Sequence, residues 1–391
     1  MMGQGRVFIV NGKRTPFGKF GGSLGGITPV DLAVYAAQAL LAETKIDPET
    51  LDQVIFANVI PSTPDTLYAG RHLALKSGLK ITTPGIVINR LCGSGIQAIL
   101  DATRLIRCKE AQALLVAGAE NMTMVPHLVY GSRFGTKYGN LKTQDLLLDT
   151  LFDKHVQTPM GITAENLAVE YKVSKEDSDA YSYHSHLKAL QAYETNLIQP
   201  EIVPIKQDRV DCSRDEHLRD DVSLEQMQKL KPTFKKDGTV TAGSASGIVD
   251  GACAMIVASE EYVQKYNLKP LAEIIDGQVV GVDPTKMGIG PVPAIQQLLE
   301  RQKKTIQDID LFEINEAFAS QVISCQRALE IPMEKLNIWG GAVALGHPLG
   351  ATGLKISMTL ARQMQHLKKD WGISSACIGG GQGIAMLLKR V

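Results

Sequence analysis

Short apolar runs alternate along the chain with longer stretches in which apolar residues recur at helical spacing. Residues 7–10 form the first such run, and further runs follow in both halves of the chain. Apolar strands that alternate with helical patterns are typical of parallel sheets covered by helices, so the pattern predicts an α/β protein. No run approaches the roughly 18 apolar residues of a membrane span, and we expect no membrane partner.

Three sequence pieces occur in the same order in each half of the chain. The first is an apolar run that ends in Asn. The second combines a short strand, a glycine turn and a long helical pattern, and the third is an apolar strand that ends in small residues. They lie at residues 52–58, 85–108 and 113–120, and again at 309–315, 337–367 and 375–383. This order indicates an internal duplication, with two similar α/β halves in a layered body.

Residues 121–245 differ from both halves, because they are rich in Met and Gly at first and strongly charged at 208–221. Residues 240–258 would return to the sheet, so we interpret this segment as an insertion. Long excursions from a compact domain are usually lids or binding loops. The predicted division is an N-terminal half at 1–120 plus 246–270, a loop domain at 121–245 and a C-terminal half at 271–391.

Charge and cysteine content exclude several classes of protein. The 391 residues carry 41 Lys and Arg against 41 Asp and Glu. A balanced charge argues against a nucleic-acid partner, which requires an excess of cations. Six cysteines without a Cys-x-x-Cys pair indicate neither a disulfide framework nor a metal site. Cys108, Cys253 and Cys325 lie in apolar periodic runs and are predicted to be in the core. Cys212 lies in a charged loop and is predicted to be exposed.

Cys92 stands in a turn that leads from a β-branched run into a helical stretch. Gly93 and Gly95 flank Ser94 and permit a tight strand-to-helix turn. A thiol at a helix N-terminus has a lowered pKa and a larger thiolate fraction, as a nucleophile needs. The turn alone fits an exposed nucleophile and a buried small residue about equally well.

Three further residues lie in or next to turns and could take part in catalysis. His347 lies in a glycine-rich turn at the position that matches Cys92 in the other half, and a thiol nucleophile needs a base. Cys377 precedes the glycine run 379–381, whose N–H groups could act as oxyanion donors, although a core cysteine is the alternative. The run lacks the helix and acidic residue of a dinucleotide loop, which excludes NAD. Asn315 ends a strand, and from this motif alone a helix N-cap is the better interpretation.

With these residues placed, the chain resembles the thiolase family over essentially its whole length. The matching segments are residues 14–18, 89–95, 315–318, 346–350 and 377–381. The resemblance implies two α/β halves in a five-layered αβαβα body with an inserted loop domain. It implies reversible acyl transfer between coenzyme A thioesters, with coenzyme A as co-substrate and no permanently bound cofactor.

The resemblance also implies a role for each site residue. Cys92 is the nucleophile that becomes acylated, and His347 is the base that activates it. Cys377 moves a proton to or from C2 of acetyl-CoA. Asn315 holds a water that stabilises the enolate oxygen together with His347. The N–H groups of Cys92 and Gly379 form a second oxyanion hole.

Coenzyme A is placed by resemblance along the loop domain. The expected contacts are Arg219, Phe234, Ala242, Ser246, Met287, Ala317 and Phe318. Two departures from the family pattern are Ser244, where Asn is usual, and Thr158, where many acetoacetyl-CoA-forming members have His. Together with Gln382, the second departure favours the degradative, mitochondrial type of thiolase and its bacterial relatives. We therefore expect thiolysis of 3-ketoacyl-CoA, as in fatty-acid β-oxidation.

Several alternatives remain at this point. An acetoacetyl-CoA-forming thiolase is the nearest, and a catalytically silent acyl-CoA-binding protein is more remote. A decarboxylating ketoacyl synthase or a papain-like hydrolase would leave Cys377 unexplained. By resemblance we expect a homo-oligomer, a dimer or tetramer, with tetramer contacts at residues 122–140. No signal-peptide core or C-terminal peroxisomal signal is visible, so we expect bacterial cytoplasm, or as second choice the mitochondrial matrix.

Overall fold

The computed structural model describes residues 5–207 and 210–391, so the start of the charged stretch predicted at 208–221 lies outside the described residues. Its main sheet has the strand order β14–β15–β16–β13–β1–β12–β5–β3–β4, with β2 paired to β12. The strands are β1 (Val7–Arg14), β2 (Gly18–Lys19), β3 (Gln53–Ala57), β4 (Gly85–Ile88), β5 (Ala113–Glu120), β12 (Val249–Ser259), β13 (Ala272–Gly281), β14 (Leu311–Ile314), β15 (Trp371–Ile378) and β16 (Gln382–Arg390).

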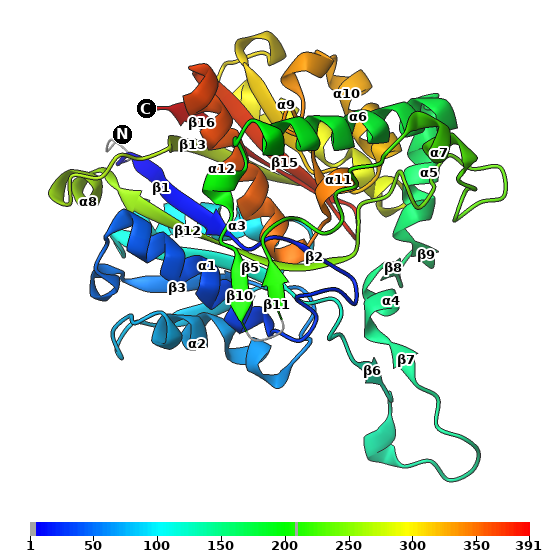
Figure 1. Cartoon of the computed structure of the whole chain (residues 1–391), viewed down its shortest axis with the longest axis horizontal. Helices are drawn as coiled ribbons and strands as arrows, with labels where there is room; N and C mark the ends of the chain where they lie inside the picture. Colours follow the sequence, from blue (N-terminus) through cyan, green and yellow to red (C-terminus); the bar gives the residue numbers. More distant parts are fainter. Residues whose placement is uncertain (1–4, 208–209) are drawn as a thin grey trace.

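The sheet has two halves, and helices cover both of them (Figure 1). α3 (Ser94–Arg107) and α12 (Leu349–Leu367) pack against strands of both halves and form a shared middle layer. The outer faces are covered by α1 (Pro29–Thr44) and α2 (Ala69–Lys76) on one side and α9 (Pro291–Arg301) and α10 (Ala319–Leu329) on the other. The expected duplicated halves in five layers are therefore confirmed.

The sheet is mixed, which corrects the prediction of parallel sheets. β3, β4 and β5 run parallel, as do β14 and β15. All other neighbours are antiparallel. β16 follows β15 after the three-residue turn 379–381, and so short a connection permits only an antiparallel hairpin.

The strand predicted in the second half near residue 337 is also absent from the described residues. Asn337 adopts a left-handed conformation, with φ of 46°. Its side-chain amide accepts a hydrogen bond from Ile314 N and donates one to Ile314 O, both at 2.9 Å. This amide completes the edge of β14 in place of a strand, and the short helix α11 (Ala342–Leu345) follows.

The excursion between β5 and β12 combines a helical part with a projecting arm. The arm, around β6 and β7, reaches far from the sheet (Figure 1). α6 starts with a capping box, in which Ser174 and Asp177 bond reciprocally to each other's backbone. The elements are β6 (His127–Leu128), β7 (Gln144–Asp145), α4 (Leu146–Thr150), β8 (Phe152–Asp153), β9 (Thr158–Pro159), α5 (Met160–Glu170), α6 (Lys175–Glu194), β10 (Ile205–Gln207), β11 (Val210–Cys212) and α7 (Leu224–Lys229). α8 (Glu260–Lys265) lies beyond β12.

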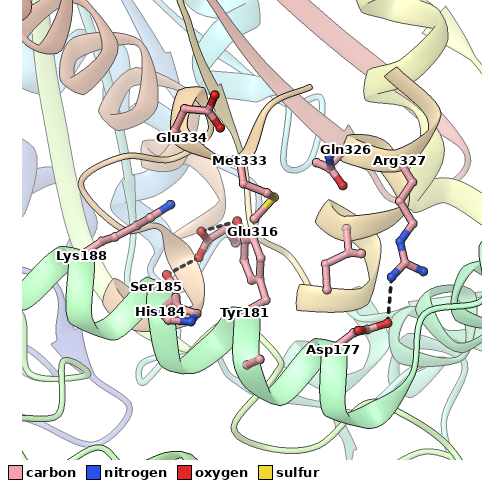
Figure 2. Close-up of a pocket in the computed structure, with 12 residues that line it drawn as sticks. Asp177, Tyr181, His184, Ser185, Lys188, Glu316, Gln326, Arg327, Met333 and Glu334 are labelled. Atoms are coloured by element: carbon pink, nitrogen blue, oxygen red, sulfur yellow. Dashed lines mark hydrogen bonds and ion pairs between the residues drawn. The ribbon is translucent and has the colours of Figure 1, made fainter. Parts of the chain in front are cut away.

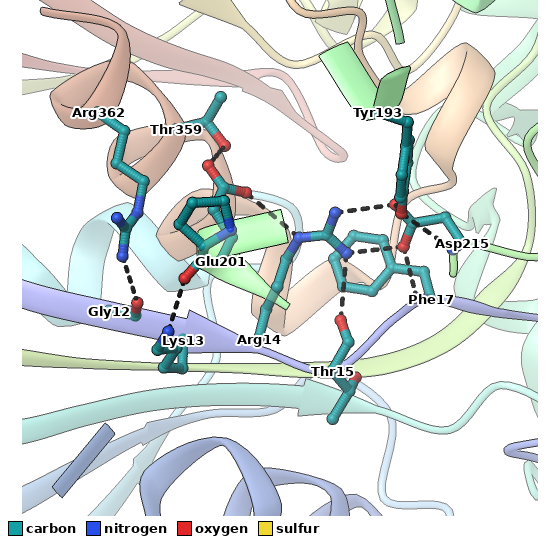
Figure 3. A network of polar contacts seen from close by, with 11 residues as sticks. Gly12, Lys13, Arg14, Thr15, Phe17, Tyr193, Glu201, Asp215, Thr359 and Arg362 are labelled. Carbon is teal, nitrogen blue, oxygen red and sulfur yellow. Dashed lines mark hydrogen bonds and ion pairs between the residues drawn. The ribbon is translucent and has the colours of Figure 1, made fainter. Parts of the chain in front are cut away.

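A buried ion pair fastens the excursion to β1 (Figure 3). Arg14 donates two hydrogen bonds to the carboxylate of Asp215, at 2.7 and 2.8 Å, and both side chains are fully buried. Tyr193 of α6 donates to the same carboxylate at 2.7 Å. Glu201 lies 3.4 Å from the Arg14 guanidinium and accepts a bond from Thr359 of α12. The first segment of the family resemblance therefore has a structural function.

Two of the four cysteine predictions are wrong. Cys253 and Cys325 are buried, as predicted. Cys108 is exposed because it caps the C-terminal end of α3. Cys212 is buried because the hairpin β10–β11 turns it into the apolar cluster beneath α1.

Candidate active site

The turn between β4 and α3 holds Cys92 in a constrained position. Leu91, one residue earlier, has a φ of 47°, a strained conformation for a branched side chain. The Ser94 hydroxyl donates to Leu91 O and accepts from Arg90 N, each at 2.7 Å. These bonds close the strand-to-helix turn that the glycine pattern predicted.

The helices that follow Cys92 and His347 cross at their first turns. A Cβ on Gly95 would lie 2.6 Å from Leu354 N, and a Cβ on Gly353 would lie 2.3 Å from Ile96 N. Only glycine permits this approach. Neither α3 nor α12 has a side-chain N-cap, unlike α1 and α6. Both positive helix ends therefore adjoin the turns that carry the two candidate residues.

Cys92, Cys377 and Gly379 come together where β15 ends beside the Cys92 turn. The backbone N–H of Gly379 donates to the Cys92 thiol. Cys377 is fully buried, and both this burial and the neighbouring Cys92 raise its pKa well above the usual value. Arg90 donates to Gln382 at 2.9 Å, which joins the two turns. The predicted second cysteine thus belongs to the same site.

The structure corrects the expected direction of the Cys92 pKa. Burial of the thiol raises this pKa to about 11, and the charge of Glu120 adds to the rise. Bonds from the backbone N–H groups of Gly379 and of Cys92 itself act in the opposite direction but are weaker. Cys92 is therefore a neutral thiol at physiological pH and needs a base.

His347 has the protonation state of such a base. It is 6% exposed, and burial lowers its pKa to about 4, so the imidazole is neutral near pH 7. The Thr352 hydroxyl donates its proton to Pro348 O at 3.0 Å. It can then only accept from His347 Nδ1–H, which lies at 2.6 Å. This bond leaves the lone pair on Nε2, and Asn315 Nδ2 lies 3.3 Å from that atom.

Asn315 is not the helix N-cap that its motif suggested, because α10 begins at Ala319, has Phe318 at its N-cap position and lacks a side-chain capping bond. Its side chain is 1% exposed, and its Oδ1 atom is buried without a protein partner. An orphaned buried oxygen beside a histidine is suited to holding a water molecule. The expectation that Asn315 acts with His347 fits this geometry.

Two functional residues were not predicted from the sequence. Thr352 fixes the tautomer of His347, and the only signal was a hydroxyl five residues after a histidine at a helix start. Glu120, fully buried, accepts bonds from the N–H groups of Val59, Ile60 and Gly350, and burial raises its pKa to about 8. It supplies from another strand a hydrogen-bond acceptor for the start of α12, which has no side-chain cap of its own.

Four of the expected coenzyme A contacts lie around Cys377. Met287, Ala317 and Phe318 form an apolar cluster with its thiol. Phe234 meets the Phe318 ring edge to face, with 6.3 Å between centroids. Apolar side chains of this kind suit contact with the pantetheine arm.

Arg219 and Ala242 line a pocket of about 250 Å³. Apolar side chains of Met227 and Leu230, at the end of α7, form another part of its wall. Ser246, four residues beyond Ala242, donates its N–H to Ala317 O at 3.0 Å. The segment 242–246 therefore runs from this pocket to the cluster around Cys377.

Family models match nearly all of the chain. The model described as "Thiolase, N-terminal domain" matches residues 7–261, and "Thiolase, C-terminal domain" matches residues 268–390. The chain belongs to the thiolase family and is an acyltransferase. The resemblance inferred from the sequence motifs is confirmed.

Individual relatives agree with this assignment. The human mitochondrial 3-ketoacyl-CoA thiolase is 47% identical over 388 residues, which cover 98% of both chains. A probable acetyl-CoA acyltransferase of Staphylococcus aureus is 43% identical and covers 98% of this chain and 99% of its own.

Solved structures show the same fold. The crystal structure of the human mitochondrial 3-ketoacyl-CoA thiolase in complex with CoA has a TM-score of 0.97 and 46% identity, covering 99% of this chain and 98% of its own. The Bacillus anthracis acetyl-CoA acetyltransferase has a TM-score of 0.96 and 38% identity, covering 99% of both chains.

Proposed function

We propose that the protein cleaves 3-ketoacyl-CoA with coenzyme A, giving acetyl-CoA and an acyl-CoA shortened by two carbons. The observations that carry the proposal are the pairing of two thiols, Cys92 and Cys377, and the neutral His347, which has Asn315 Nδ2 at 3.3 Å and precedes α12, the helix that crosses α3. This reaction requires a nucleophile, a base and a separate acid, and the site contains a residue suited to each task.

In the first half-reaction, Cys92 transfers its proton to His347 Nε2 and attacks the C3 carbonyl carbon. The developing oxyanion accepts bonds from the N–H groups of Cys92 and Gly379. The C2–C3 bond then breaks, and its electron pair leaves as the enolate of acetyl-CoA. Cys377 protonates C2, while the enolate oxygen is stabilised by His347 and a water held by Asn315.

In the second half-reaction, coenzyme A attacks the acyl group on Cys92. Cys377, left as a thiolate after it protonated C2, takes the proton of the coenzyme A thiol. The resulting thiolate adds to the thioester carbon, and the Cys92 sulfur leaves as the tetrahedral intermediate collapses and takes back its proton from His347. The same N–H groups of Cys92 and Gly379 stabilise that intermediate. The acyl donor and the acceptor use the same binding site in turn while the acyl group stays on Cys92, which implies ping-pong kinetics.

The pocket beside α7 is our proposed site for the nucleotide end of coenzyme A. Arg219 supplies a cation, and Met227 and Leu230 supply an apolar surface for the adenine. The pantetheine would follow Ala242 to Ser246 and pass Phe234, Met287, Ala317 and Phe318. In this pose the substrate thioester reaches Cys92 and Cys377.

Thiolysis measured against acyl chain length tests the substrate assignment. Loss of the enolate absorbance of 3-ketoacyl-CoA should occur over medium and long chains, and Cys92→Ala and Cys377→Ala should each abolish it. The 38% identity to an acetyl-CoA acetyltransferase supports the second candidate, an acetoacetyl-CoA-forming enzyme. Activity confined to acetoacetyl-CoA would establish that candidate. Coenzyme A binding without any turnover would establish the silent binding protein.

We also propose a homo-oligomer. β4 is the end of the sheet path, and apolar side chains around it are exposed; they are Leu67, Tyr68, Ile81 and Ile86. Such an edge is suited to pairing with a second copy. The projecting arm exposes Tyr130, Phe134, Tyr138 and Leu141, which fits the expected tetramer contacts. If shortening the 122–140 segment leaves the tetramer size unchanged in gel filtration, the arm has no such role.

The domain division and the location are retained as proposals. Residues 121–245 as a loop domain agree with an excursion that begins after β5 and ends before β12. Among the described residues, no helix has the length and apolar character needed to span a bilayer. The relatives include both a mitochondrial and a bacterial protein, and bacterial cytoplasm remains our first choice over the mitochondrial matrix.

A further inference from the structure

Glu316 directly follows Asn315 and is almost completely buried, with 1% of its surface exposed. It borders a cavity of about 500 Å³ between α6 and α10 (Figure 2). Its carboxylate accepts four hydrogen bonds of 2.8 to 3.0 Å, from Tyr181 OH and Asn337 Nδ2 at Oε1 and from Ser185 Oγ and Val343 N at Oε2.

The four donors belong to three separate segments. Tyr181 and Ser185 lie on α6, as Figure 2 shows. Val343 lies on α11, which ends two residues before His347. Asn337 completes the edge of β14, the strand that leads to Asn315. One carboxylate therefore joins the segments that position both members of the Asn315–His347 pair.

We propose that Glu316 is a positioning residue that sets the 3.3 Å separation between Asn315 Nδ2 and His347 Nε2. It fixes the end of β14 on one side and the start of α11 on the other. This inference rests on the proposed function, because the pair matters only if it acts on the enolate.

The network requires a carboxylate rather than an amide. Asn337 cannot reverse its amide, because Oδ1 accepts from Ile314 N and Nδ2 donates to Ile314 O. Val343 N–H is likewise only a donor. One of these obligate donors faces each oxygen of Glu316. An amide at position 316 would therefore place its NH₂ group against an N–H donor in either orientation.

Glu316→Gln tests this requirement, and Glu313→Gln is the matched control. Glu313 is a buried carboxylate within β14, the strand that ends just before Glu316. It accepts a hydrogen bond from Gln363 of α12 and, in the described part of the chain, makes none to α6 or α11. A displacement on the order of 1 Å at reacting groups costs about 100-fold in rate. We expect kcat of thiolysis to fall by about that factor in Glu316→Gln, with the KM for coenzyme A within about twofold.

The control should keep kcat within about threefold of the unmutated enzyme. Equal losses of kcat in both variants, or a loss expressed in KM instead of kcat, would overturn the inference. If Glu316→Gln does not fold, Tyr181→Phe and Ser185→Ala each remove one donor and leave the carboxylate. Either should lower kcat about tenfold, as expected for one lost hydrogen bond to a charged group. Unchanged kcat in both would also overturn it.

The unmutated enzyme separates this inference from the proposed function. If it does not cleave 3-ketoacyl-CoA, the proposed function fails. If it does and Glu316→Gln retains full kcat, only the role of Glu316 is refuted.

Discussion

Replacing Asp215 with Asn would test how strongly the buried ion pair binds the excursion to β1. Asp215 accepts four hydrogen bonds of 2.7 to 2.8 Å, two from Arg14 and one each from Phe17 N and Tyr193 OH. Asn has almost the same shape but only one oxygen, so its NH₂ group must face a donor. Arg14 would remain buried, with Glu201 at 3.4 Å as its remaining anion.

The magnitude follows from the burial of both partners. Removing one member of a fully buried pair leaves an uncompensated charge and costs about 3–5 kcal/mol of unfolding free energy. Tyr193→Phe keeps the ion pair but removes two hydrogen bonds, the one that its hydroxyl donates to the Asp215 carboxylate and the one that it accepts from Asp215 N at 3.1 Å, so it should cost about 2 kcal/mol. The difference between these variants isolates the charge from the hydrogen bonds.

Urea unfolding measures both effects through the fluorescence of Trp339 and Trp371. For a protein of this size, with an m-value of at least about 3 kcal/mol/M, Asp215→Asn should lower the midpoint by on the order of 1 M. Tyr193→Phe should lower it by roughly half of that amount. If Asp215→Asn is no more destabilising than Tyr193→Phe, the pair contributes no charge compensation and the reasoning is refuted.

Four further predictions concern the site and the crossing of α3 with α12. Thr352→Val removes the acceptor for His347 Nδ1–H and should lower kcat about tenfold with little change in KM. Thr352→Ser keeps a hydroxyl and should have the kcat of the unmutated enzyme. Steady-state thiolysis measures both variants, and an unchanged kcat in Thr352→Val would refute the tautomer assignment. Because burial raises the pKa of Cys92 to about 11, its alkylation by iodoacetamide without substrate should rise about tenfold per pH unit from pH 7 to 10, and a plateau in that range would contradict this. Because the pKa of His347 is lowered to about 4, the base is lost only as pH falls through about 4, so kcat/KM should show no decline near pH 6.5 on the acid side. Gly353→Ala places a Cβ 2.3 Å from Ile96 N and should destabilise the fold by about 2 kcal/mol or more in urea unfolding, whereas Gly26→Ala, with nothing within 4 Å, should not.

Local sequence signals located the turns that carry the candidate residues, whereas the roles of these residues came from the family resemblance. Cys92 and His347 each lie in a glycine-containing turn that leads into a long helix. Neighbouring residues in the sequence determine such a turn. The duplicated pieces likewise located β3, β5, β14 and β15. An apolar run predicts a buried strand whichever segments of the chain pack against it. The return to the sheet through β12 followed from the apolar run at residues 240–258.

Features that depend on distant partners could not be predicted. The Cys92 pKa depends on burial against the other half of the chain, so a rule for helix ends gave the wrong direction. Glu316 gains its role from α6, more than 130 residues earlier. Cys108 and Cys212 exchanged their expected environments because exposure depends on the packing of a helix end and a hairpin. The antiparallel strand pairs were also not predicted, because the direction of a strand depends on the chain connections between neighbouring strands.

The place of β1 has a consequence for how the protein is made. β1 is the earliest described strand in the chain, yet it lies fifth of nine in the main path, between β12 and β13. Its partners start only at residues 249 and 272. At about 5–20 residues per second, the ribosome needs roughly 10–50 s to supply them. β1, which is almost entirely buried in the finished fold, therefore stays without its partner strands through most of synthesis.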